Sequence, residues 1–301
     1  TSPTHYRVAV IGGGPSGLGC AAQLKRYGYD IDIYEKEDSL GGLIDRVIPE
    51  YRLPHETVIH DLERLIDSGI NLHLNTKINQ ENAKGILNDY NAVFIGTGLS
   101  NIRLFSKNGE ELKIEGVSSA MDYLDDVRCA DIKNENPPDL GQQVIIVGGG
   151  NVALDAAVMA KRHGADRVIV LYRRSNEEMP GWESEYLEAA RLGVEFRWLS
   201  TIKEFVVADN KLFSIDVETM RFSRTSSNGR RRVEPAADIP IYNLKCDSVV
   251  LALGQFLDNA ILDHFDLPQP EFGQIPINTN YQTENPKIFA GGEVANGGGT
   301  I

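Results

Sequence analysis

The strongest constraint on this chain is an apolar run followed by three glycines, which occurs twice. Residues 8–17 read VAVIGGGPSG, and residues 144–153 read VIIVGGGNVA. After each run a helical pattern of small residues ends at a glycine, and a second strand pattern follows at residues 31–35 and 167–172. A strand, a tight turn, a helix and a second strand form the βαβ unit of a parallel sheet. The sequence therefore predicts an α/β protein with two Rossmann-like, doubly wound parallel-sheet domains.

The first turn carries the spacing of a dinucleotide-binding loop, with Gly12, Gly14 and Gly17 as G-x-G-x-x-G. The first glycine allows the tight turn, the second lets a pyrophosphate approach the backbone, and the third permits close helix packing. Glu35 follows Gly12 by 23 residues, at the end of the next strand, where a carboxylate accepts both hydroxyls of a ribose. A glycine-rich turn without a ligand is the alternative. The stretch SLGGL at 39–43 adds a second glycine pair, which indicates a longer ligand, a flavin dinucleotide.

The second turn differs at the position that decides the ligand. Gly148, Gly150 and Ala153 form G-x-G-x-x-A, and Arg173 and Arg174 stand where the first copy has an acid. A carboxylate there would repel a 2′-phosphate, whereas two guanidinium groups would hold one through charge-assisted hydrogen bonds. A solvated arginine pair at the end of a strand is the alternative. We therefore predict that FAD binds at the first turn and NADPH at the second.

Composition narrows the choice of partners and of compartment. The 301 residues carry a net charge of −13, which disfavours nucleic acid and anionic membranes as partners, and no apolar run approaches the length of a membrane span. The three cysteines, Cys20, Cys129 and Cys246, are far apart and form no C-x-x-C. This spacing argues against a redox dithiol and against a metal site within the chain, and unpaired thiols fit a cytoplasmic location.

The remaining segments give a coarse outline of the two domains. We expect a helix at 55–68, strands at 70–74 and 92–95, a linker at 131–140, a helix at 183–192 and a strand at 248–253. Two β-ribbon segments are expected at 204–221 and 230–247, joined by the basic stretch SRTSSNGRRR. That stretch fits a solvated turn, although a binding role is left open. The last residues, from 287, are expected to form a strand and a glycine-rich loop, with no helix after the loop.

At this point the sequence resembles the flavoproteins with two dinucleotide-binding domains, and among them the small subunit of bacterial glutamate synthase and the flavin–NADPH part of dihydropyrimidine dehydrogenase. The resemblance covers nearly the whole chain. Its most specific motifs are IPEYRLP at 48–54 and YRRSNEEMPG at 172–181, and it also includes FIGTG at 94–98, ALGQ at 252–255 and FAGGEV at 289–294. It implies that the NADPH domain, residues 106–254, is inserted into the FAD domain, residues 1–105 and 255–301.

The resemblance also implies which residues contact each dinucleotide. Those at FAD would be Gly12, Gly14, Pro15, Ser16, Gly17, Glu35, Lys36, Gly42, Leu43, Arg52, Ile78, Thr97, Gly98, Gly292, Glu293 and Thr300. Those at NADPH would be Gly148, Gly149, Gly150, Asn151, Val152, Arg173 and Arg174, with Ala252, Leu253 and Gly254 marking the return to the first domain. No side chain is expected to act as a nucleophile and no metal is expected, because the hydride passes directly between the two cofactors.

The implied function is that of an NADPH-dependent FAD oxidoreductase that passes electrons to iron–sulfur clusters or to another acceptor. Because the sequence offers no cluster ligands, these clusters are expected on a partner subunit or on a segment outside the chain, which is itself expected to be part of a longer polypeptide. The sequence departs from the family's pattern in three ways. Glu293 replaces the usual aspartate, no cysteine-rich segment precedes the first strand, and the flavin-facing helix after the last glycine loop is missing.

Three other functions compete with this interpretation. A reductase of disulfides, similar to thioredoxin reductase, would need a pair of cysteines near the flavin. A stand-alone ferredoxin–NADP or small-molecule reductase would need no partner subunit. A non-enzymatic sensor of NADPH would need only one of the two glycine turns, so the presence of both favours an enzyme.

Overall fold

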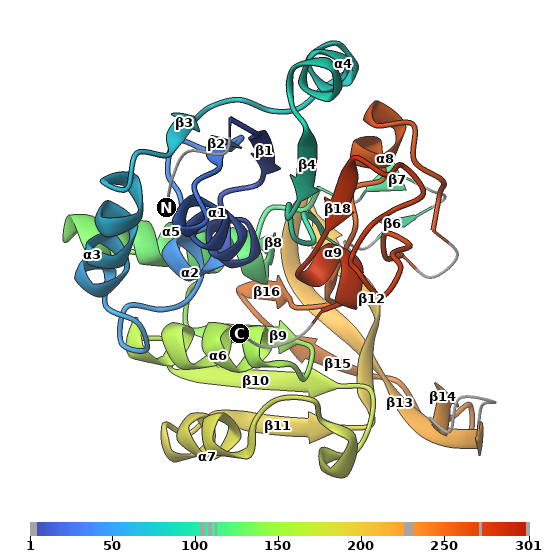
Figure 1. Cartoon of the computed structure of the whole chain (residues 1–301). Coiled ribbons are helices and arrows are strands. Elements are labelled where there is room, and N and C mark those ends of the chain that lie inside the picture. Colours follow the sequence, from blue (N-terminus) through green and yellow to red (C-terminus); the bar gives the residue numbers. More distant parts are fainter. Residues whose placement is uncertain are drawn as a thin grey trace. The chain divides into compact units, whose positions relative to one another are not determined.

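The computed structural model describes residues 5–102, 106–107, 110–111, 113–225, 231–270 and 273–298. The chain divides into two compact units (Figure 1). Unit 1 combines Thr1–Arg103 with Gln255–Ile301, and unit 2 is Leu104–Gly254. The second unit is therefore inserted, in the sequence, between the two stretches that form the first.

Unit 1 is built on a parallel sheet of five strands in the order β18-β4-β1-β2-β3, in which every neighbouring pair is parallel. Its strands are β1 (Arg7–Ile11), β2 (Asp30–Tyr34), β3 (Asn71–His73), β4 (Ala92–Ile95) and β18 (Ile288–Ala290), and a separate pair joins β5 (Asn101–Ile102) to β17 (Gln255–Phe256). Its helices are α1 (Pro15–Arg26), α2 (Leu43–Arg46), α3 (His55–Ile66), α4 (Gln80–Asp89), α8 (Ala260–His264) and α9 (Glu293–Asn296).

Alternating residues of the central strand β1 explain why helices cover both faces of this sheet. Val8 and Val10 belong to one core with residues of α1 and α3, while Ala9 and Ile11 belong to a second core with residues of α4 and α8. Successive side chains of a strand point to opposite faces, so an unbroken apolar run needs a cover on each side. Each isoleucine or valine buried in this way contributes about 1.5–3 kcal/mol of transfer free energy.

Unit 2 contains a second parallel sheet of five strands, in the order β11-β10-β9-β16-β8. Its strands are β8 (Val117–Ser119), β9 (Gln143–Val147), β10 (Arg167–Tyr172), β11 (Glu195–Trp198) and β16 (Ser248–Leu251). The antiparallel strands are β12 (Ser200–Ala208), β13 (Lys211–Thr225), β14 (Arg231–Pro235) and β15 (Tyr242–Lys245), and a short pair joins β6 (Ser106–Lys107) to β7 (Glu110–Glu111). The helices are α5 (Ala120–Lys133), α6 (Asn151–Arg162), the short 3₁₀ helix η1 (Asn176–Glu178) and α7 (Glu183–Arg191).

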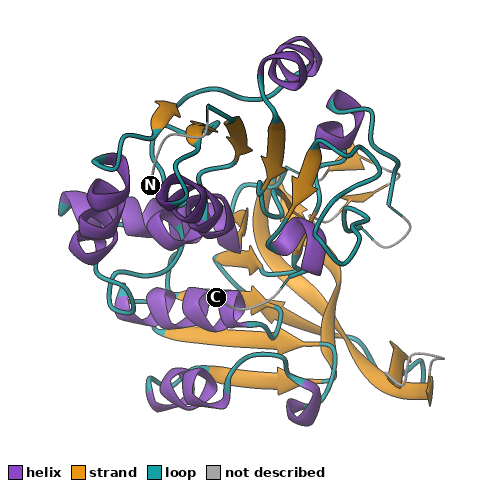
Figure 2. Ribbon diagram, viewed as in Figure 1, coloured by secondary structure: helices purple, strands orange, loops and turns teal. Residues whose placement is uncertain are grey.

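The two faces of the second sheet have different covers (Figure 2). Alternate residues of β9, β10 and β16 pack against the antiparallel sheet, in a core that includes Ile202, Phe205, Ile215 and Leu244. Helices α5 and α6 contact the parallel strands β16, β9 and β10. The predicted fold class, two Rossmann-like parallel-sheet domains, is confirmed. The sequence did not predict that a β layer would take the place of helices on one face of unit 2.

Several elements differ from the sequence-based outline. Helix α5 runs to Lys133, into the expected linker, and α4 was not anticipated. Asn79 and Ser119 cap these two helices by accepting backbone N–H groups, which is a local signal for a helix start. The short helix α9 lies within the glycine-rich end, after Gly292, where the sequence predicted only a strand and a loop. The centre of the basic stretch, residues 226–230, lies outside the described residues.

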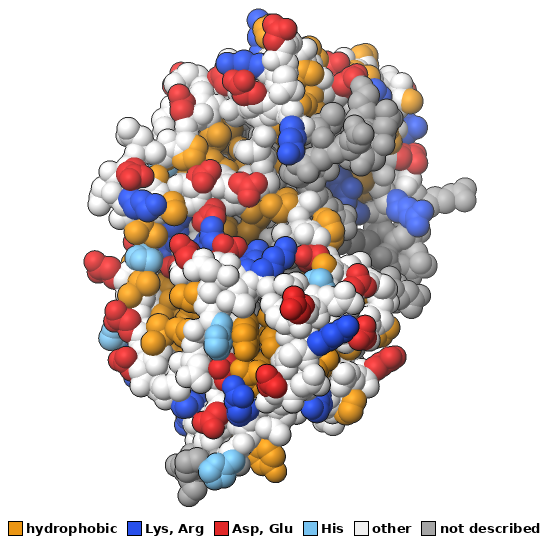
Figure 3. Space-filling model, turned by 90° about the horizontal axis from the view of Figure 1, so that it is seen from above, with side chains coloured by type: hydrophobic (Ala, Val, Ile, Leu, Met, Phe, Trp, Pro, Cys, Tyr) orange, Lys and Arg blue, Asp and Glu red, His pale blue; other side chains and the backbone are white. Residues whose placement is uncertain are grey.

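Charge is not concentrated on the face shown in Figure 3, where acidic and basic side chains are interspersed. Within the described ranges, we find no helix that is both long and apolar enough to cross a bilayer. A search of the same residues finds no group of three or more histidine, cysteine or acidic side chains arranged to hold a metal ion.

Candidate functional site

The first glycine turn joins β1 to α1, and its glycines serve different purposes. Gly12 has a φ of +100°, and a methyl group on it would lie 2.6 Å from the carbonyl oxygen of Gly96. A methyl group on Gly17 would overlap the carbonyl oxygen of Gly12. Gly14 is different, because a methyl group there would meet no described atom within 4 Å. Internal packing therefore requires Gly12 and Gly17, while Gly14 faces open space at the start of the helix.

The start of α1 is able to hold an anion. Gly14 is its N-cap residue, and no described side chain caps the helix there. Pro15 occupies the first helical position and has no N–H, so the donors of the first turn begin at Ser16. Unpaired N–H groups and the positive end of the helix dipole favour a phosphate at this position.

Glu35, at the end of β2, is held against this turn. Its side chain is buried, and its two carboxylate oxygens accept the N–H of Gly13 (2.6 Å) and the N–H of Glu37 (3.0 Å). Two backbone donors fix the direction of the carboxylate, and each oxygen keeps a further lone pair. The carboxylate can therefore accept the hydroxyl groups of a ribose without being displaced.

The second glycine pair packs directly on the first turn. Gly41 donates its N–H to the carbonyl oxygen of Gly13 (2.8 Å), and a methyl group on Gly42 would lie 3.1 Å from the Cα of Gly14. Leu43 then begins α2. Arg52 lies further along, in the loop before α3, where its Nε donates to Tyr51 Oη (3.4 Å).

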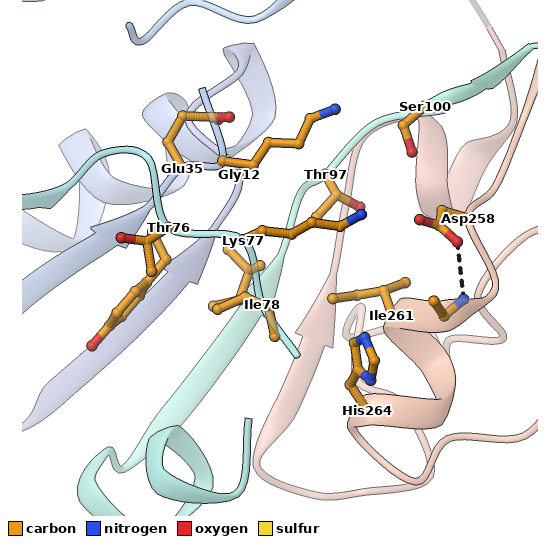
Figure 4. A pocket seen from close by; sticks show the side chains of 14 residues that line it. Gly12, Glu35, Thr76, Lys77, Ile78, Thr97, Ser100, Asp258, Ile261 and His264 are labelled. Atoms are coloured by element: carbon orange, nitrogen blue, oxygen red, sulfur yellow. Dashed lines mark hydrogen bonds between the residues drawn. The ribbon is translucent and has the colours of Figure 1, made fainter. Parts of the chain in front are cut away.

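A cavity in unit 1 brings several predicted residues together (Figure 4). Gly12, Glu35, Lys36, Ile78 and Thr97 all line it, and Arg52 is not among the described residues that do. The sequence did not predict the remaining lining residues: Ile11, Tyr34, Thr76, Lys77, Ser100, Asp258, Ala260, Ile261 and His264. The last four come from the stretch of chain after the inserted unit, so no local spacing connects them to the first glycine turn.

The end of the second stretch also meets the first glycine turn. A methyl group on Gly292, whose φ is +73°, would lie 2.8 Å from the Cβ of Ser16. A methyl group on Gly98 would lie 3.9 Å from an oxygen of Glu293, the first residue of α9. Thr300, also predicted to contact FAD, lies outside the described residues.

The glycine turn of unit 2, between β9 and α6, repeats the arrangement of the first. A methyl group on Gly148 would overlap the carbonyl oxygen of Ala252, and one on Gly149 would lie 2.6 Å from the ring of Tyr172. Gly150, the N-cap residue of α6, has no described atom within 4 Å of its methyl position. Ala153 is fully buried, as the third position of the motif requires.

A loop from the YRRSNEEMPG motif packs on this second turn. Gly181 donates its N–H to the carbonyl oxygen of Gly149 (2.9 Å), and Trp182 donates its N–H to Oδ1 of Asn151 (2.9 Å). Val152 follows in the first turn of α6, and Leu253 and Gly254 follow β16 at the end of the unit. The predicted residues Gly149, Asn151 and Ala252 therefore lie around one turn.

The two arginines after β10 are not equivalent. Arg173 is exposed and forms no ion pair with any described residue. The side chain of Arg174 is only 12% exposed; its Nη1 donates to the carbonyl oxygen of Arg231 (2.6 Å) and lies 3.6 Å from Oε2 of Glu178. Arg231, from β14, was not among the predicted site residues. The basic stretch that contains it was the only sequence signal that pointed there.

Comparison with known proteins agrees with this geometry. Residues 6–301 match the family described as pyridine nucleotide-disulphide oxidoreductase. The chain belongs to this family. It is 34% identical over 98% of its length to the NADP(+)-dependent formate dehydrogenase subunit beta of Moorella thermoacetica, and 30% identical over 98% to the glutamate synthase [NADPH] small chain of Escherichia coli K12.

This pyridine nucleotide-disulphide oxidoreductase chain spans 41% of the formate dehydrogenase subunit and 64% of the glutamate synthase small chain. Among solved structures, Mycobacterium tuberculosis FprA in complex with NADPH superimposes with a TM-score of 0.82 and 18% identity, over 98% of this chain and 80% of FprA. At that identity the likeness concerns the fold. The resemblance to the glutamate synthase small subunit is confirmed.

Proposed function

We propose that the chain is an NADPH-dependent FAD oxidoreductase, with FAD bound in unit 1 and NADPH in unit 2, that delivers electrons to an acceptor on a partner. The observation that carries the proposal is the contrast at the ends of two matching strands. A buried carboxylate, Glu35, follows the first glycine turn, and two guanidinium groups, Arg173 and Arg174, follow the second. Two similar turns followed by opposite charges are expected to bind different dinucleotides.

In unit 1, the residues present fit the adenosine and pyrophosphate parts of FAD. The open space at Gly14 and the first N–H groups of α1 would receive the pyrophosphate, and Glu35 would accept the ribose hydroxyls. Ile78 and Ile261 lie on opposite sides of the cavity in Figure 4 and would hold the two faces of the adenine. We assign Ser16, Gly98, Gly292 and Glu293 to the flavin end, because they meet beyond the glycine turn.

In unit 2, Gly150 and the first turn of α6 would receive the NADPH pyrophosphate. Gly14 and the first turn of α1 would play the same part for the FAD pyrophosphate in unit 1. Arg173 is free to approach a 2′-phosphate, and Arg174 would add a second positive charge from a more constrained position. When bound, FAD would take a hydride from NADPH and could release the two electrons separately. The chain's own residues would bind and orient the two cofactors, and no side chain is assigned as a nucleophile.

We assign the electron acceptor to a partner subunit or to a segment outside residues 1–301, and by resemblance we expect it to carry iron–sulfur clusters. Two of the relatives are themselves parts of larger enzymes by name, a subunit beta and a small chain, which supports a multi-subunit enzyme. The three cysteines are free thiols, which supports a reducing compartment such as the cytoplasm.

The decisive experiment is anaerobic mixing of the FAD-loaded chain with NADPH or NADH in a stopped-flow spectrometer. Loss of the flavin absorbance at ~450 nm should be much faster with NADPH than with NADH, since the proposed site in unit 2 recognises the 2′-phosphate that NADH lacks. One-electron acceptors and small-molecule substrates are then added separately to the reduced protein. A folded protein that cannot be loaded with FAD, or a flavin that NADPH does not reduce, would contradict the proposal.

A further inference from the structure

The loop that follows β10 has a charge balance unsuited, by itself, to recognising a phosphate. Within residues 172–178 it carries two arginines, Arg173 and Arg174, and two glutamates, Glu177 and Glu178. These charges cancel, and Glu178 lies close to one of the arginines, with Oε2 3.6 Å from Nη1 of Arg174. A carboxylate in that position competes with a phosphate for the same guanidinium group and repels the phosphate. A positive charge from elsewhere is therefore needed.

Arg231 supplies that charge from a different part of the unit. Its Nε donates to Oε1 of Glu178 (3.0 Å), and its Nη2 lies 4.0 Å from Oε2 of Glu177. The guanidinium group is also held over the ring of Phe222, 3.8 Å from the ring centroid. Hydrogen bonding and ring stacking together fix the direction of an arginine side chain.

The backbone at the same position is fixed to the loop as well. The carbonyl oxygen of Arg231 accepts the Nη1 of Arg174 (2.6 Å), and the hydroxyl of Tyr172 donates to the carbonyl oxygen of Glu178 (2.9 Å). Arg174, Glu178 and Arg231 thus form one connected network. The side chain of Glu178 is 20% exposed, so its neutralisation is less screened by solvent than that of a surface carboxylate.

We propose that Arg231 is a positioning residue that determines the preference for NADPH over NADH. It pairs with Glu178, so the loop presents Arg173 and Arg174 to the 2′-phosphate with a net positive charge. Arg231 acts through Glu178 and does not need to touch the ligand. This inference rests on the proposed NADPH site, and it adds a residue from the antiparallel sheet to that site's specificity.

The test compares two nucleotides that differ at the 2′ position. Adenosine 2′,5′-bisphosphate carries the 2′-phosphate and 5′-AMP lacks it, and isothermal titration calorimetry on the FAD-loaded chain measures both affinities. Arg231→Ala should weaken binding of the bisphosphate about tenfold, the size expected of one charge-assisted interaction, and change 5′-AMP binding less than about twofold. Adding Glu178→Gln should return the bisphosphate affinity to within about threefold of the original, because the repelling carboxylate is then gone.

Arg232→Ala is the matched control, since it removes the same charge from the next residue of β14, where the side chain is exposed. It should leave both affinities within about twofold. The single variant Glu178→Gln provides a second measurement that keeps Arg231 in place. It should raise the affinity for the bisphosphate and leave that for 5′-AMP unchanged.

Three results would overturn the inference: an equal loss for both nucleotides in Arg231→Ala, a loss of less than about twofold for the bisphosphate, or no recovery on adding Glu178→Gln. If Arg231→Ala does not fold, a Glu178→Gln variant without increased bisphosphate affinity overturns it as well. The unmodified chain tests the site itself. If it binds the bisphosphate no more tightly than 5′-AMP, the proposed NADPH site fails, whereas a clear preference that Arg231→Ala leaves intact contradicts only the role of Arg231.

Discussion

The carboxylate of Glu35 accepts the backbone N–H of Gly13 at 2.6 Å, which joins the end of β2 to the glycine turn after β1. The two residues are 22 apart in the sequence, and each follows one of two strands that are neighbours in the sheet. The charged group that is proposed to bind a ribose is therefore held by the same turn that is proposed to bind the pyrophosphate.

We expect Glu35→Gln to weaken FAD binding about tenfold or more, because a neutral amide replaces charge-assisted acceptance of two hydroxyls. Quenching of FAD fluorescence on titration with the apoprotein measures this affinity. Glu37→Gln is a suitable control, since that side chain is more exposed and pairs with Lys36 and Arg46. A comparable loss of FAD affinity in both variants would contradict the assigned role of Glu35.

Two glycines of the first turn, Gly14 and Gly17, should respond differently to replacement by alanine. Gly17→Ala should lower the melting temperature of the apoprotein by about 5 °C or more, because the methyl group overlaps the carbonyl oxygen of Gly12. Gly14→Ala should leave that temperature nearly unchanged, because the added methyl group meets open space.

The FAD affinity of the Gly14→Ala variant should nevertheless fall about tenfold or more, because the methyl group occupies the space through which a pyrophosphate would approach. Calorimetric melting with and without FAD separates the two effects. A Gly14→Ala protein that binds FAD normally would show that the pyrophosphate lies elsewhere.

The two arginines after β10 should also differ when each is replaced. Arg173→Ala should weaken NADPH binding about tenfold with little change for NADH or for stability, since Arg173 is exposed. Arg174→Ala should weaken NADPH binding and also lower the melting temperature, because it removes the charge beside Oε2 of the partly buried Glu178. Parallel NADPH and NADH titrations with thermal melting test this; an equal loss for both nucleotides would contradict the assignment of the 2′-phosphate.

The cysteines should react with iodoacetamide in an order set by burial. Burial raises the pKa of Cys20 to about 11, and burial with the nearby Asp247 raises the pKa of Cys246 to about 12, while Cys129 is exposed. The thiolate is the reactive form, so near pH 8 the folded protein should be labelled at Cys129 well before the other two. Peptide mass spectrometry with timed sampling measures the order, and denatured protein, in which all three should react, is the control.

The same shifts have a consequence for stability. Because the pKa of each of these two thiols is raised in the folded protein, the same thiols in the unfolded protein lose their protons at a lower pH, above about 9. The folded state should therefore lose stability between about pH 9 and pH 11–12. Rapid labelling of Cys246 in native protein near pH 8 would show that its environment is open to solvent and would contradict both expectations.

Much of the outline follows from local patterns in the sequence. The two apolar runs with three glycines predicted the central strands β1 and β9 and the helices α1 and α6, because a buried parallel strand and a tight turn impose strict local requirements. The helix expected at 55–68 is α3, and the one expected at 183–192 is α7, with ends that differ by one or two residues. The linker expected at 131–140 was wrong in its first residues, because the last turn of α5 occupies them.

The sequence alone determined the two glycine turns and the charges that follow them, Glu35 and the Arg173–Arg174 pair, since these lie at fixed distances along a βαβ unit. Only the tertiary structure decided that α8 lines the cavity beside Glu35, that a β layer covers one face of the second sheet, and that Arg231 meets Glu178. Those contacts join segments tens to hundreds of residues apart. Packing of the whole chain brings them together, and no local spacing encodes it.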